Sequence, residues 1–491
     1  MSAPNCLRCL VRPSAALRLS APPPASALKP ATPPLTAAAS RRAPFSTTPA
    51  AAAAPKSSSQ GQQAAAKGHV RKGKRLTLKG KKKQKSLDHG KSPLPGERKA
   101  YRKRITLSND NAIKVPWLTD LAAPDLADPA NVGKVLALPP TTQDQLRASE
   151  AFKPTQTWGM FRQPAVLVRK ETVDLTQRMQ EAAAARKVLR MVVTGNKVTG
   201  KSLMLLQAMT HAFLNEWVVI HLPEAQELTT AVTEYAPLAD TSPVQYSQPV
   251  YALKLLHAIR KANADVLAKT FTVSEHSELP QSLPAGSPLL AIANQAKEVD
   301  SAWVIFQALW NELMAPAPNR PPILLSLDGL AHVMRVSDYR SPAFEPIHAF
   351  DLALVRLFTD ALGGAVKFPA GGAVLGATSR NNSPRSPSME LALAQREAEQ
   401  QQQQQPGVEV PQKDPFFRGY DERVDAVLRS VQVLRLGGVD RREARALLEY
   451  WAASGMLRTV VDEKAVAEKW TLAGGGVLGE MERASLLTMR V

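Results

Sequence analysis

Short apolar runs recur along the middle of the chain, and they predict the strands of a buried sheet. Each run holds five to seven residues and is rich in aliphatic side chains. Continuous apolar runs of this length are typical of strands that are covered on both faces, as in parallel α/β sheets. The predicted strands are residues 188–194, 218–222, 323–328 and 372–378.

Longer stretches, in which apolar residues recur every three or four positions, predict helices between and after these strands. Because strands and helices alternate along the chain, the predicted fold class is α/β. The predicted helices are residues 170–187, 203–214, 250–268, 291–314 and 441–454, and a last short helix follows Gly474, Gly475 and Gly476.

The segment Gly195-Asn196-Lys197-Val198-Thr199-Gly200-Lys201-Ser202 fits the pattern GxxxxGK[ST] at every fixed position, between a predicted strand and a predicted helix. In this pattern the glycines let backbone N–H groups face phosphates at a helix N-terminus, the lysine reaches the β- and γ-phosphates, and the serine hydroxyl contacts Mg²⁺. The sequence therefore predicts a P-loop NTPase domain. The expected nucleotide contacts are Gly195, Asn196, Val198, Thr199, Gly200, Lys201, Ser202 and Leu203.

The predicted strand 323–328 ends in Asp328, a pattern in which the carboxylate helps to hold Mg²⁺. We therefore expect Ser202 and Asp328 as the metal ligands. The strand 372–378 is followed by Ser379-Arg380-Asn381, either a plain turn or a sensor that faces the γ-phosphate, since ligands bind at the carboxyl ends of such strands.

The position directly after Asp328 is Gly329, where ATPases of the AAA type usually carry a second acid that activates water. Glu345 and Asp351 lie farther along the chain, and their spacing makes neither of them a catalytic base. The sequence thus supports nucleotide binding better than hydrolysis, and it indicates no catalytic residue.

Residues 1–45 have the composition of a mitochondrial transit peptide. Ala, Ser, Thr, Pro and Arg dominate them, no acidic residue precedes Asp88, and Arg41-Arg42 is similar to a processing site. The alternative is a disordered tail without a targeting role. Cys6 and Cys9 form one CxxC pair without further ligands, so they indicate neither a zinc site nor a redox site. No apolar run approaches the roughly 18 residues of a membrane span.

Residues 46–107 form a basic arm. Residues 1–104 hold 23 of the 62 lysines and arginines but only two of the 43 acids, so they carry a net charge of +21 and the rest of the chain −2. The arm has too few apolar residues to fold alone, and we expect it to be disordered until it contacts RNA. A nuclear-localisation patch and a solubilising tail are the competing interpretations.

Three further regions complete the predicted organisation. Residues 108–165 form an extended segment rich in Pro and Trp, before the nucleotide-binding domain at 166–381. Residues 382–413 are a low-complexity insert around the glutamines 400–405, and we expect a disordered linker or loop. Residues 414–491 form a small helical lid domain.

The chain resembles the mitochondrial small-subunit ribosomal proteins of the death-associated-protein family over roughly residues 110–491. Four features carry the resemblance. They are the run from Phe152-Lys153-Pro154 to Trp158-Gly159-Met160-Phe161-Arg162-Gln163-Pro164, the loop GNKVTGKS, the strand ILLSLDGL, and the closing pattern from Glu443-Ala444 to Glu480-Met481-Glu482. The leader and the glutamine-rich insert lie outside it.

The resemblance implies an AAA-like P-loop domain with a C-terminal helical lid, located in the mitochondrial matrix in the head of the small ribosomal subunit. The implied cofactors are GTP or GDP with Mg²⁺, and ATP stays open because no guanine-reading NKxD box is present. The implied partners are small-subunit rRNA, neighbouring ribosomal proteins and the large subunit at the intersubunit face. The competing functions are an active mitochondrial ATPase or GTPase and a nucleotide-dependent signalling switch.

Overall fold

The structure is a computed structural model that describes residues 105–239, 241–380, 383–403, 405, 407–416 and 419–487. Contacts divide the chain into the units Met1–Ser86 and Leu87–Val491, and every described residue belongs to the second unit. The predicted transit peptide and almost all of the basic arm lie outside the described residues, so those interpretations stay predictions.

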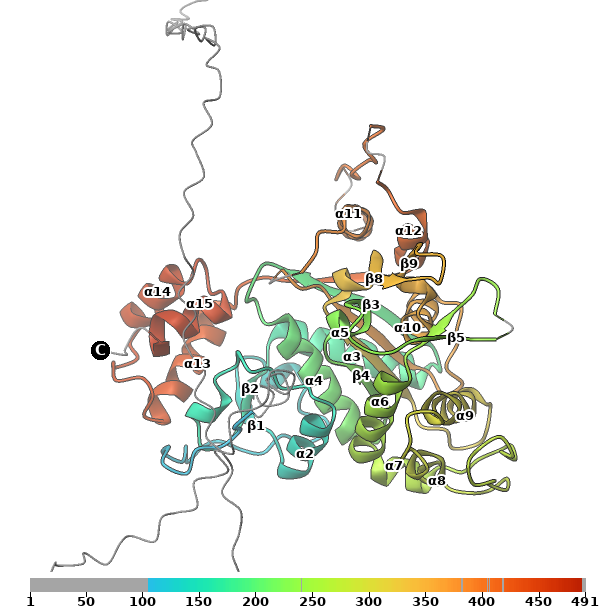
Figure 1. The fold of residues 1–491 in the computed structure, drawn as a ribbon. Helices are drawn as coiled ribbons and strands as arrows, with labels where there is room; N and C mark the ends of the chain where they lie inside the picture. Colours follow the sequence, from blue (N-terminus) through green and yellow to red (C-terminus); the bar gives the residue numbers. More distant parts are fainter. Residues whose placement is uncertain are drawn as a thin grey trace, which may run out of the picture. The chain divides into compact units, whose positions relative to one another are not determined.

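A five-stranded parallel sheet forms the centre of the described part (Figure 1). Its strand order is β11-β3-β10-β7-β4. The four strands predicted from the sequence are confirmed, and a fifth, β11, joins them beside β3. The strands are β3 (Val188–Gly195), β4 (Val218–Leu222), β7 (Ile323–Asp328), β10 (Gly372–Ala377) and β11 (Gln432–Leu436).

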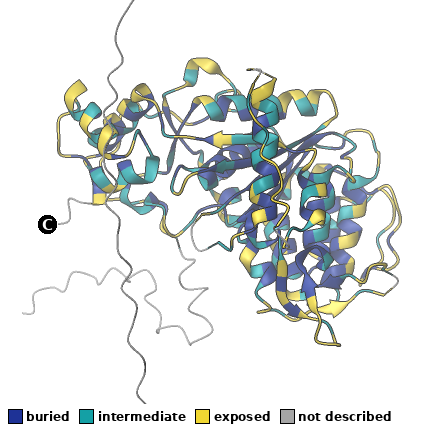
Figure 2. Ribbon diagram, turned by 90° about the horizontal axis from the view of Figure 1, so that it is seen from above, coloured by how far each residue is buried: buried dark blue, intermediate teal, exposed yellow. Residues whose placement is uncertain are grey.

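The strands β4, β7 and β10 are largely apolar on both faces because both faces are covered. Along β7, Ile323, Leu325 and Leu327 pack into one core cluster, and Leu324 packs into the other. Every residue of β4, β7 and β10 is buried, and Figure 2 shows the sheet between the helices in the buried colour. This two-sided burial explains why the sequence shows continuous apolar runs rather than alternation.

Helices α3 (Lys170–Ala184) and α4 (Lys201–Leu214) cover one face of the sheet, and α6 (Pro249–Ala262), α9 (Ala302–Met314) and α10 (Ala353–Gly363) cover the other. The remaining elements are shorter. They are α5 (Ala225–Thr229), α7 (Ala264–Lys269), α8 (Leu289–Asn294), the strand pairs β5 (Ala236–Pro237) with β6 (Tyr246–Ser247) and β8 (Val336–Arg340) with β9 (Pro346–His348), and the 3-10 turns Leu330–His332 and Ala349–Asp351.

The helix predicted at 250–268 is broken at Asn263, which separates α6 from α7. The Asn263 side chain accepts a hydrogen bond from the Val219 N–H at 2.7 Å and donates one to the Val219 carbonyl at 2.9 Å. Val219 lies in the edge strand β4, so the side-chain amide of Asn263 satisfies backbone groups that have no neighbouring strand as a partner. The break therefore protects the sheet edge.

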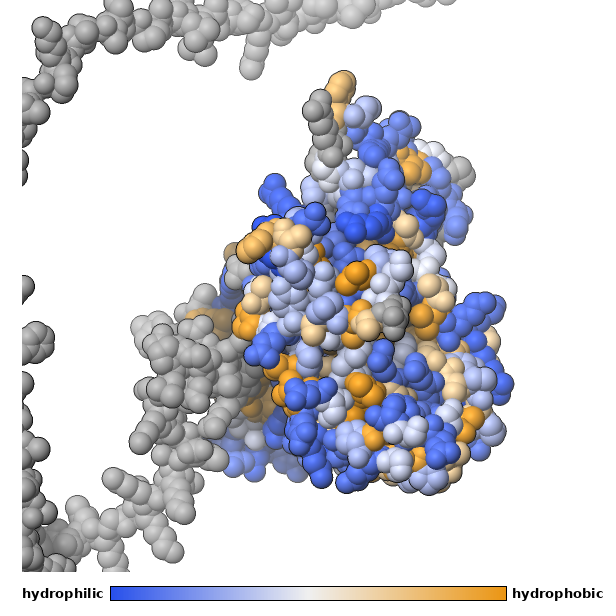
Figure 3. Space-filling view, turned by 45° about the vertical axis from the view of Figure 1, so that its right-hand side comes forward, coloured by the Kyte–Doolittle hydropathy of each residue, from blue (hydrophilic) through white to orange (hydrophobic). Residues whose placement is uncertain are grey.

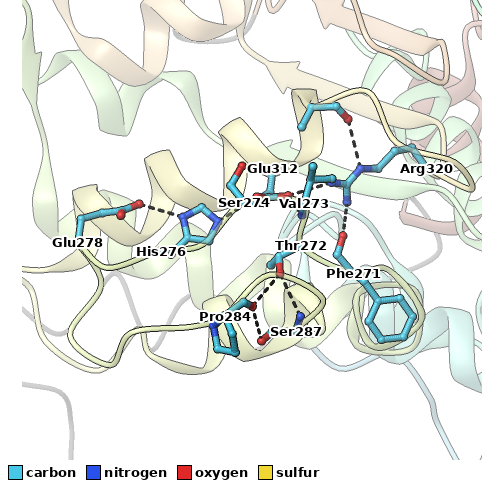
Figure 4. Close-up of polar contacts among 11 residues, drawn as sticks. Phe271, Thr272, Val273, Ser274, His276, Glu278, Pro284, Ser287, Glu312 and Arg320 are labelled. Atoms are coloured by element: carbon cyan, nitrogen blue, oxygen red, sulfur yellow. Dashed lines mark hydrogen bonds and ion pairs between the residues drawn. The ribbon is translucent and has the colours of Figure 1, made fainter.

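The helix predicted at 291–314 is also two helices, α8 and α9, and the segment between α7 and α8 is held by a buried carboxylate on α9. Glu312 accepts hydrogen bonds from the N–H groups of Val273 and Ser274, each at 2.8 Å, and pairs with Arg320 at 2.9 Å and His276 at 3.0 Å (Figure 4). Burial alone raises the pKa of Glu312, but these hydrogen bonds outweigh it and lower the pKa.

Half of the insert at 382–413 is a helix and not the disordered linker or loop that the composition indicates. Residues Pro387–Gln402 form α11, with Met389, Ala392 and Leu393 buried against the body. These apolar residues lie three and four positions apart, and therefore on one helix face, although the glutamine run hides the pattern. Gln400 accepts a hydrogen bond from the Val433 N–H at 3.3 Å, so the run itself contacts β11.

The lid boundary predicted at 414 is also wrong. The helix α12 (Glu422–Leu428) packs on α10 and α11, and β11 belongs to the central sheet. The separate helical part consists of α13 (Arg441–Ala453), α14 (Glu463–Leu472), α15 (Leu478–Glu482) and the π-helical turn Arg483–Leu487. We call these helices the lid. Figure 1 shows them grouped beside the sheet-containing body.

The segment predicted as extended, 108–165, contains short elements and links the lid to the body. They are β1 (Val135–Ala137), which pairs antiparallel with β2 (Ala165–Leu167), the helix α2 (Pro140–Ala148), and the 3-10 turns Pro129–Asn131 and Trp158–Met160. Val135, Phe161 and Leu167 share one core cluster with lid residues such as Trp451.

The described helices include none that is long and apolar enough to cross a membrane. On the face shown in Figure 3, hydrophobic residues form separate spots among polar ones.

Candidate functional site

The loop between β3 and α4 has the backbone that its two glycines permit. Gly195 has a φ of 148° and Gly200 a φ of 98°, both in the region that favours glycine. A Cβ atom on Gly195 would lie 2.5 Å from the carbonyl oxygen of Leu436, at the end of β11. The glycines therefore let the loop pass close to the neighbouring strand and turn into α4.

Lys201, the first residue of α4, is folded back onto this loop. Its ammonium donates hydrogen bonds to the carbonyls of Gly195, at 3.1 Å, and Asn196. Burial, and then the charge of Arg380, lower the pKa of Lys201 to about 8, while Asp328 acts in the opposite direction. A phosphate beside Lys201 would favour its charged form, so this position suits an anion.

The structure brings together the two residues expected to bind a metal. The Ser202 hydroxyl donates a hydrogen bond to Oδ2 of Asp328 at 2.8 Å. Asp328 ends β7, which lies between β10 and β4 in the sheet. Oxygen ligands of this kind fit Mg²⁺, which keeps few protein ligands and completes its shell with phosphate and water. In the part of the chain that the structure describes, no cluster of three or more His, Cys, Asp or Glu offers a metal site.

A cavity of about 530 Å³ opens over this loop, within the roughly 300–1,000 Å³ usual for small-molecule sites. Most of the predicted contact residues line it, and so does Lys197. Gly195 and Asn196 do not line it, and they contribute the carbonyls that hold Lys201. The predicted residues in the lining are Val198, Thr199, Gly200, Lys201, Ser202, Leu203 and Asp328.

A second group of lining residues is apolar and comes from the lid and the segment before α3. Val135, Phe161, Leu167, Tyr450 and Trp451 line the cavity and belong to one packed cluster. The cavity therefore combines a cationic loop with an apolar wall, the combination that a nucleotide needs for its phosphates and its base.

The residues after β10 also reach the cavity. Thr378, Ser379 and Arg380 line it together with Lys201, and the charge of Arg380 contributes to the lowered pKa of Lys201. Asn381 lies outside the described residues. The geometry agrees with the sensor interpretation of Ser379 and Arg380, which stays a prediction.

No carboxylate follows Asp328 directly, because Gly329 occupies that position with a φ of 86°. A Cβ atom at Gly329 would lie 3.5 Å from the His332 ring, which also lines the cavity. Glu345 and Asp351 are not among the lining residues. The carboxylates that line the cavity besides Asp328 are Glu224, which follows β4, and Glu482 of the lid.

The lid contacts the loop directly. The Gly479 N–H donates a hydrogen bond to the Val198 carbonyl at 3.0 Å, and Val198 has a φ of 54°. Buried Arg169 donates to the carbonyl of Thr199 in the loop at 3.1 Å and to that of Gly437 before the lid at 3.2 Å. The conformation of the loop is thus coupled to the position of the lid.

Lys153, Arg169 and Glu482 are among the cavity residues that were not predicted from the sequence as site residues. Lys153 Nζ lies 3.2 Å from Asp328 Oδ2. Glu482 accepts a hydrogen bond from the Thr157 hydroxyl, and burial raises the pKa of Glu482. Their partners are remote in the sequence, so no local pattern marks them, although Lys153 and Glu482 lie in the runs on which the family resemblance rests.

Comparison with known proteins matches the sequence of this chain to a described family. Residues 166–484 match the family described as mitochondrial ribosomal death-associated protein 3, and this range contains the sheet, the loop and nearly all of the lid. The small ribosomal subunit protein mS29 of Neurospora crassa is 59% identical over 491 residues, which cover 100% of both chains. The protein of the same name from Bos taurus is 21% identical over 201 residues, 40% of this chain and 50% of its own length.

The family match covers well over half of the chain and the fungal relative covers all of it, and the resemblance noted in the sequence points the same way. The chain belongs to the family of mitochondrial ribosomal death-associated protein 3.

Proposed function

We propose that this protein is a structural component of the small subunit of the mitochondrial ribosome, in the mitochondrial matrix, that holds a purine nucleotide. The observation that carries the nucleotide part is the strand–loop–helix over residues 188–214, whose Lys201 and Ser202 face a cavity together with Asp328. The ribosomal part rests on the family and on relatives that are named as small ribosomal subunit proteins.

The fold would accordingly be a P-loop NTPase domain of AAA-like type. In support, the loop that follows β3 and Asp328, the last residue of β7, lie at the same edge of the parallel sheet, with β10 between the two strands. The α4 N-terminus follows the loop, and its dipole favours a phosphate there. The residues that would contact the phosphates are Val198, Thr199, Gly200, Lys201 and Ser202.

The proposed ligand is GTP or GDP with Mg²⁺, with ATP as the alternative. The resemblance to the family favours guanine. The apolar wall formed by residues such as Tyr450 and Trp451 offers a stacking surface to either purine. Ser202 and Asp328 would hold the metal, which when bound neutralises charge on the phosphates.

A binding role without efficient hydrolysis is the better supported one, because Gly329 leaves no acid directly after Asp328. The nucleotide would then act by stabilising the folded state to which it binds. The basic arm, which carries most of the net positive charge of the chain, would contact small-subunit rRNA, and the folded body would contact neighbouring ribosomal proteins and the large subunit.

An active NTPase is the second candidate, and one observation favours it. Glu224 follows β4, the strand beside β7, and lines the same cavity as Asp328. A carboxylate at the end of the neighbouring strand is a candidate base for water attack. Turnover of GTP or ATP by the purified protein, lost in both Lys201→Ala and Glu224→Gln, would establish this candidate in place of the first.

Calorimetric titration of the purified full chain with GTP, GDP and ATP tests the proposed nucleotide site. We expect binding of a purine nucleotide, weakened by about tenfold or more in Lys201→Ala, since a charge-assisted contact to phosphate is lost. Lys269→Met removes a lysine that pairs with Glu216 on the surface away from the cavity, and should bind like the wild type. A wild-type chain that binds no purine nucleotide would refute the proposal.

A further inference from the structure

The ammonium of Lys153 lies beside the carboxylate of Asp328. It comes from the segment between α2 and the 3-10 turn Trp158–Met160 and reaches across to the carboxyl end of the sheet. Its Nζ lies 3.2 Å from Asp328 Oδ2 and donates a hydrogen bond to the carbonyl of Pro223, the residue that follows β4. The side chains of Lys153 and Asp328 are only 17% and 11% exposed.

The backbone around Lys153 is fixed by its own neighbours. Gln156 Oε1 accepts hydrogen bonds from the Lys153 N–H at 2.8 Å and from the Trp158 indole N–H at 2.7 Å. The rings of Phe152 and Trp158 meet edge to face at 5.4 Å, and both residues are buried. Lys153 therefore belongs to a well-packed segment, which holds its ammonium in place beside Asp328.

The oxygen of Asp328 that Lys153 contacts also belongs to the expected metal site. Asp328 Oδ2 accepts the hydrogen bond from Ser202 at 2.8 Å and lies 3.2 Å from Lys153 Nζ. A Mg²⁺ ion near this oxygen would meet the charge of Lys153, and the two cations would repel each other strongly where solvent screening is weak. The carboxylate is already neutralised by a cation that belongs to the chain.

We propose that Lys153 is a tethered cation that takes over part of the role of Mg²⁺, so that the nucleotide binds with little dependence on the metal. The inference rests on the proposed nucleotide site and deepens it. Lys153 neutralises Asp328 at the phosphate end of the cavity, and together with Lys201 and Arg380 it supplies the positive charge that a bound metal would otherwise supply.

The test measures the affinity of the full chain for GDP and GTP by titration in Mg²⁺ and, separately, in EDTA. We expect the wild-type affinity to differ by less than about threefold between the two conditions. In Lys153→Met, Asp328 lacks its cation, and the affinity should fall by about tenfold or more in EDTA and recover in Mg²⁺. Lys153→Arg, which retains the charge, should restore most of the wild-type behaviour.

Lys269→Met serves as the matched control, because it removes a surface lysine from an ion pair outside the cavity and should leave the metal dependence unchanged. Equal dependence on Mg²⁺ in the wild type, Lys153→Met and Lys153→Arg would overturn the inference and leave the nucleotide site intact. Absence of nucleotide binding by the wild type in both conditions would instead refute the proposed function. Should Lys153→Met fail to fold, the wild-type comparison decides alone, and a wild type that needs Mg²⁺ for binding overturns the inference.

Discussion

Asp328 is the residue at which three parts of the chain meet. It ends β7, accepts a hydrogen bond from Ser202 at the start of α4, and pairs with Lys153 from the segment before the sheet. A carboxylate in such a place is costly to bury unless cations and donors surround it. Here Ser202 and Lys153 satisfy the carboxylate, so the same contacts stabilise the fold and shape the cavity.

Buried histidines make the stability of the domain depend on pH. His211 on α4 has no exposed surface, and burial lowers its pKa to about 4 from an ordinary value of 6.5. Between these values the unfolded chain binds a proton that the folded chain does not, so stability falls as the pH falls. From pH 7.5 to pH 5 this group contributes a loss on the order of 2 kcal/mol.

The variant His211→Leu should therefore show a shallower decrease in thermal midpoint between pH 7.5 and pH 5 than the wild type. Met209→Leu, an exchange of buried apolar residues on the same helix, should keep the wild-type decrease. A decrease in His211→Leu that matches the wild type would show that His211 is not the group responsible.

At the scale of single residues, the sequence is informative where the chemistry is local. The loop from Gly195 to Ser202 is recognisable because its fixed positions are adjacent, and the structure places it and Asp328 at one cavity. Lys153, Arg169 and Glu482 could not be assigned, because their roles depend on contacts between segments far apart in the chain. Such contacts follow from strand order and lid docking, which no short pattern encodes.

At the scale of elements, the segment between α7 and α8 depends on a single buried carboxylate. Replacing Glu312 by Gln removes the charge that pairs with buried Arg320 and His276. Breaking a buried pair in this way typically costs about 3–5 kcal/mol, because the remaining charge lacks its partner. We expect a lower thermal midpoint and faster amide hydrogen exchange over residues 271–288.

The control for this substitution is Glu216→Gln. It breaks the exposed pair with Lys269, and a surface pair contributes little. Similar loss of stability in both variants, or unchanged exchange over residues 271–288 in Glu312→Gln, would contradict the role given to Glu312.

Element prediction succeeded where burial is uniform and failed where tertiary contacts decide. The four predicted strands are confirmed because a doubly covered sheet leaves continuous apolar runs. The helix break at Asn263 was missed because its cause is a pair of hydrogen bonds to β4. The helix α11 was missed because low-complexity composition hid Met389, Ala392 and Leu393, and β11 because its strand is only partly buried.

At the scale of the whole molecule, the chain consists of a strongly basic N-terminal part and a folded body whose net charge is close to zero. The arm carries most of the net charge of the protein, and contact with RNA, a polyanion, would depend strongly on salt. Most of the cavity lining belongs to the body, the lid contacts the loop through Gly479, and Arg169 of the body bonds both the loop and Gly437 before the lid. A bound nucleotide would join loop, lid and sheet, and a ligand that binds only the folded state stabilises it.

We propose that the protein is a component of the small ribosomal subunit that holds a nucleotide. The most direct test isolates mitochondrial small subunits that contain the tagged full chain on a density gradient and measures, in the same fractions, the purine nucleotide released per chain, for the wild type and for Lys201→Ala. We predict that the wild type sediments with the small subunit and carries a nucleotide that Lys201→Ala lacks or holds more weakly. A chain that sediments apart from the small subunit, or that sediments with it and holds no nucleotide, would contradict the account.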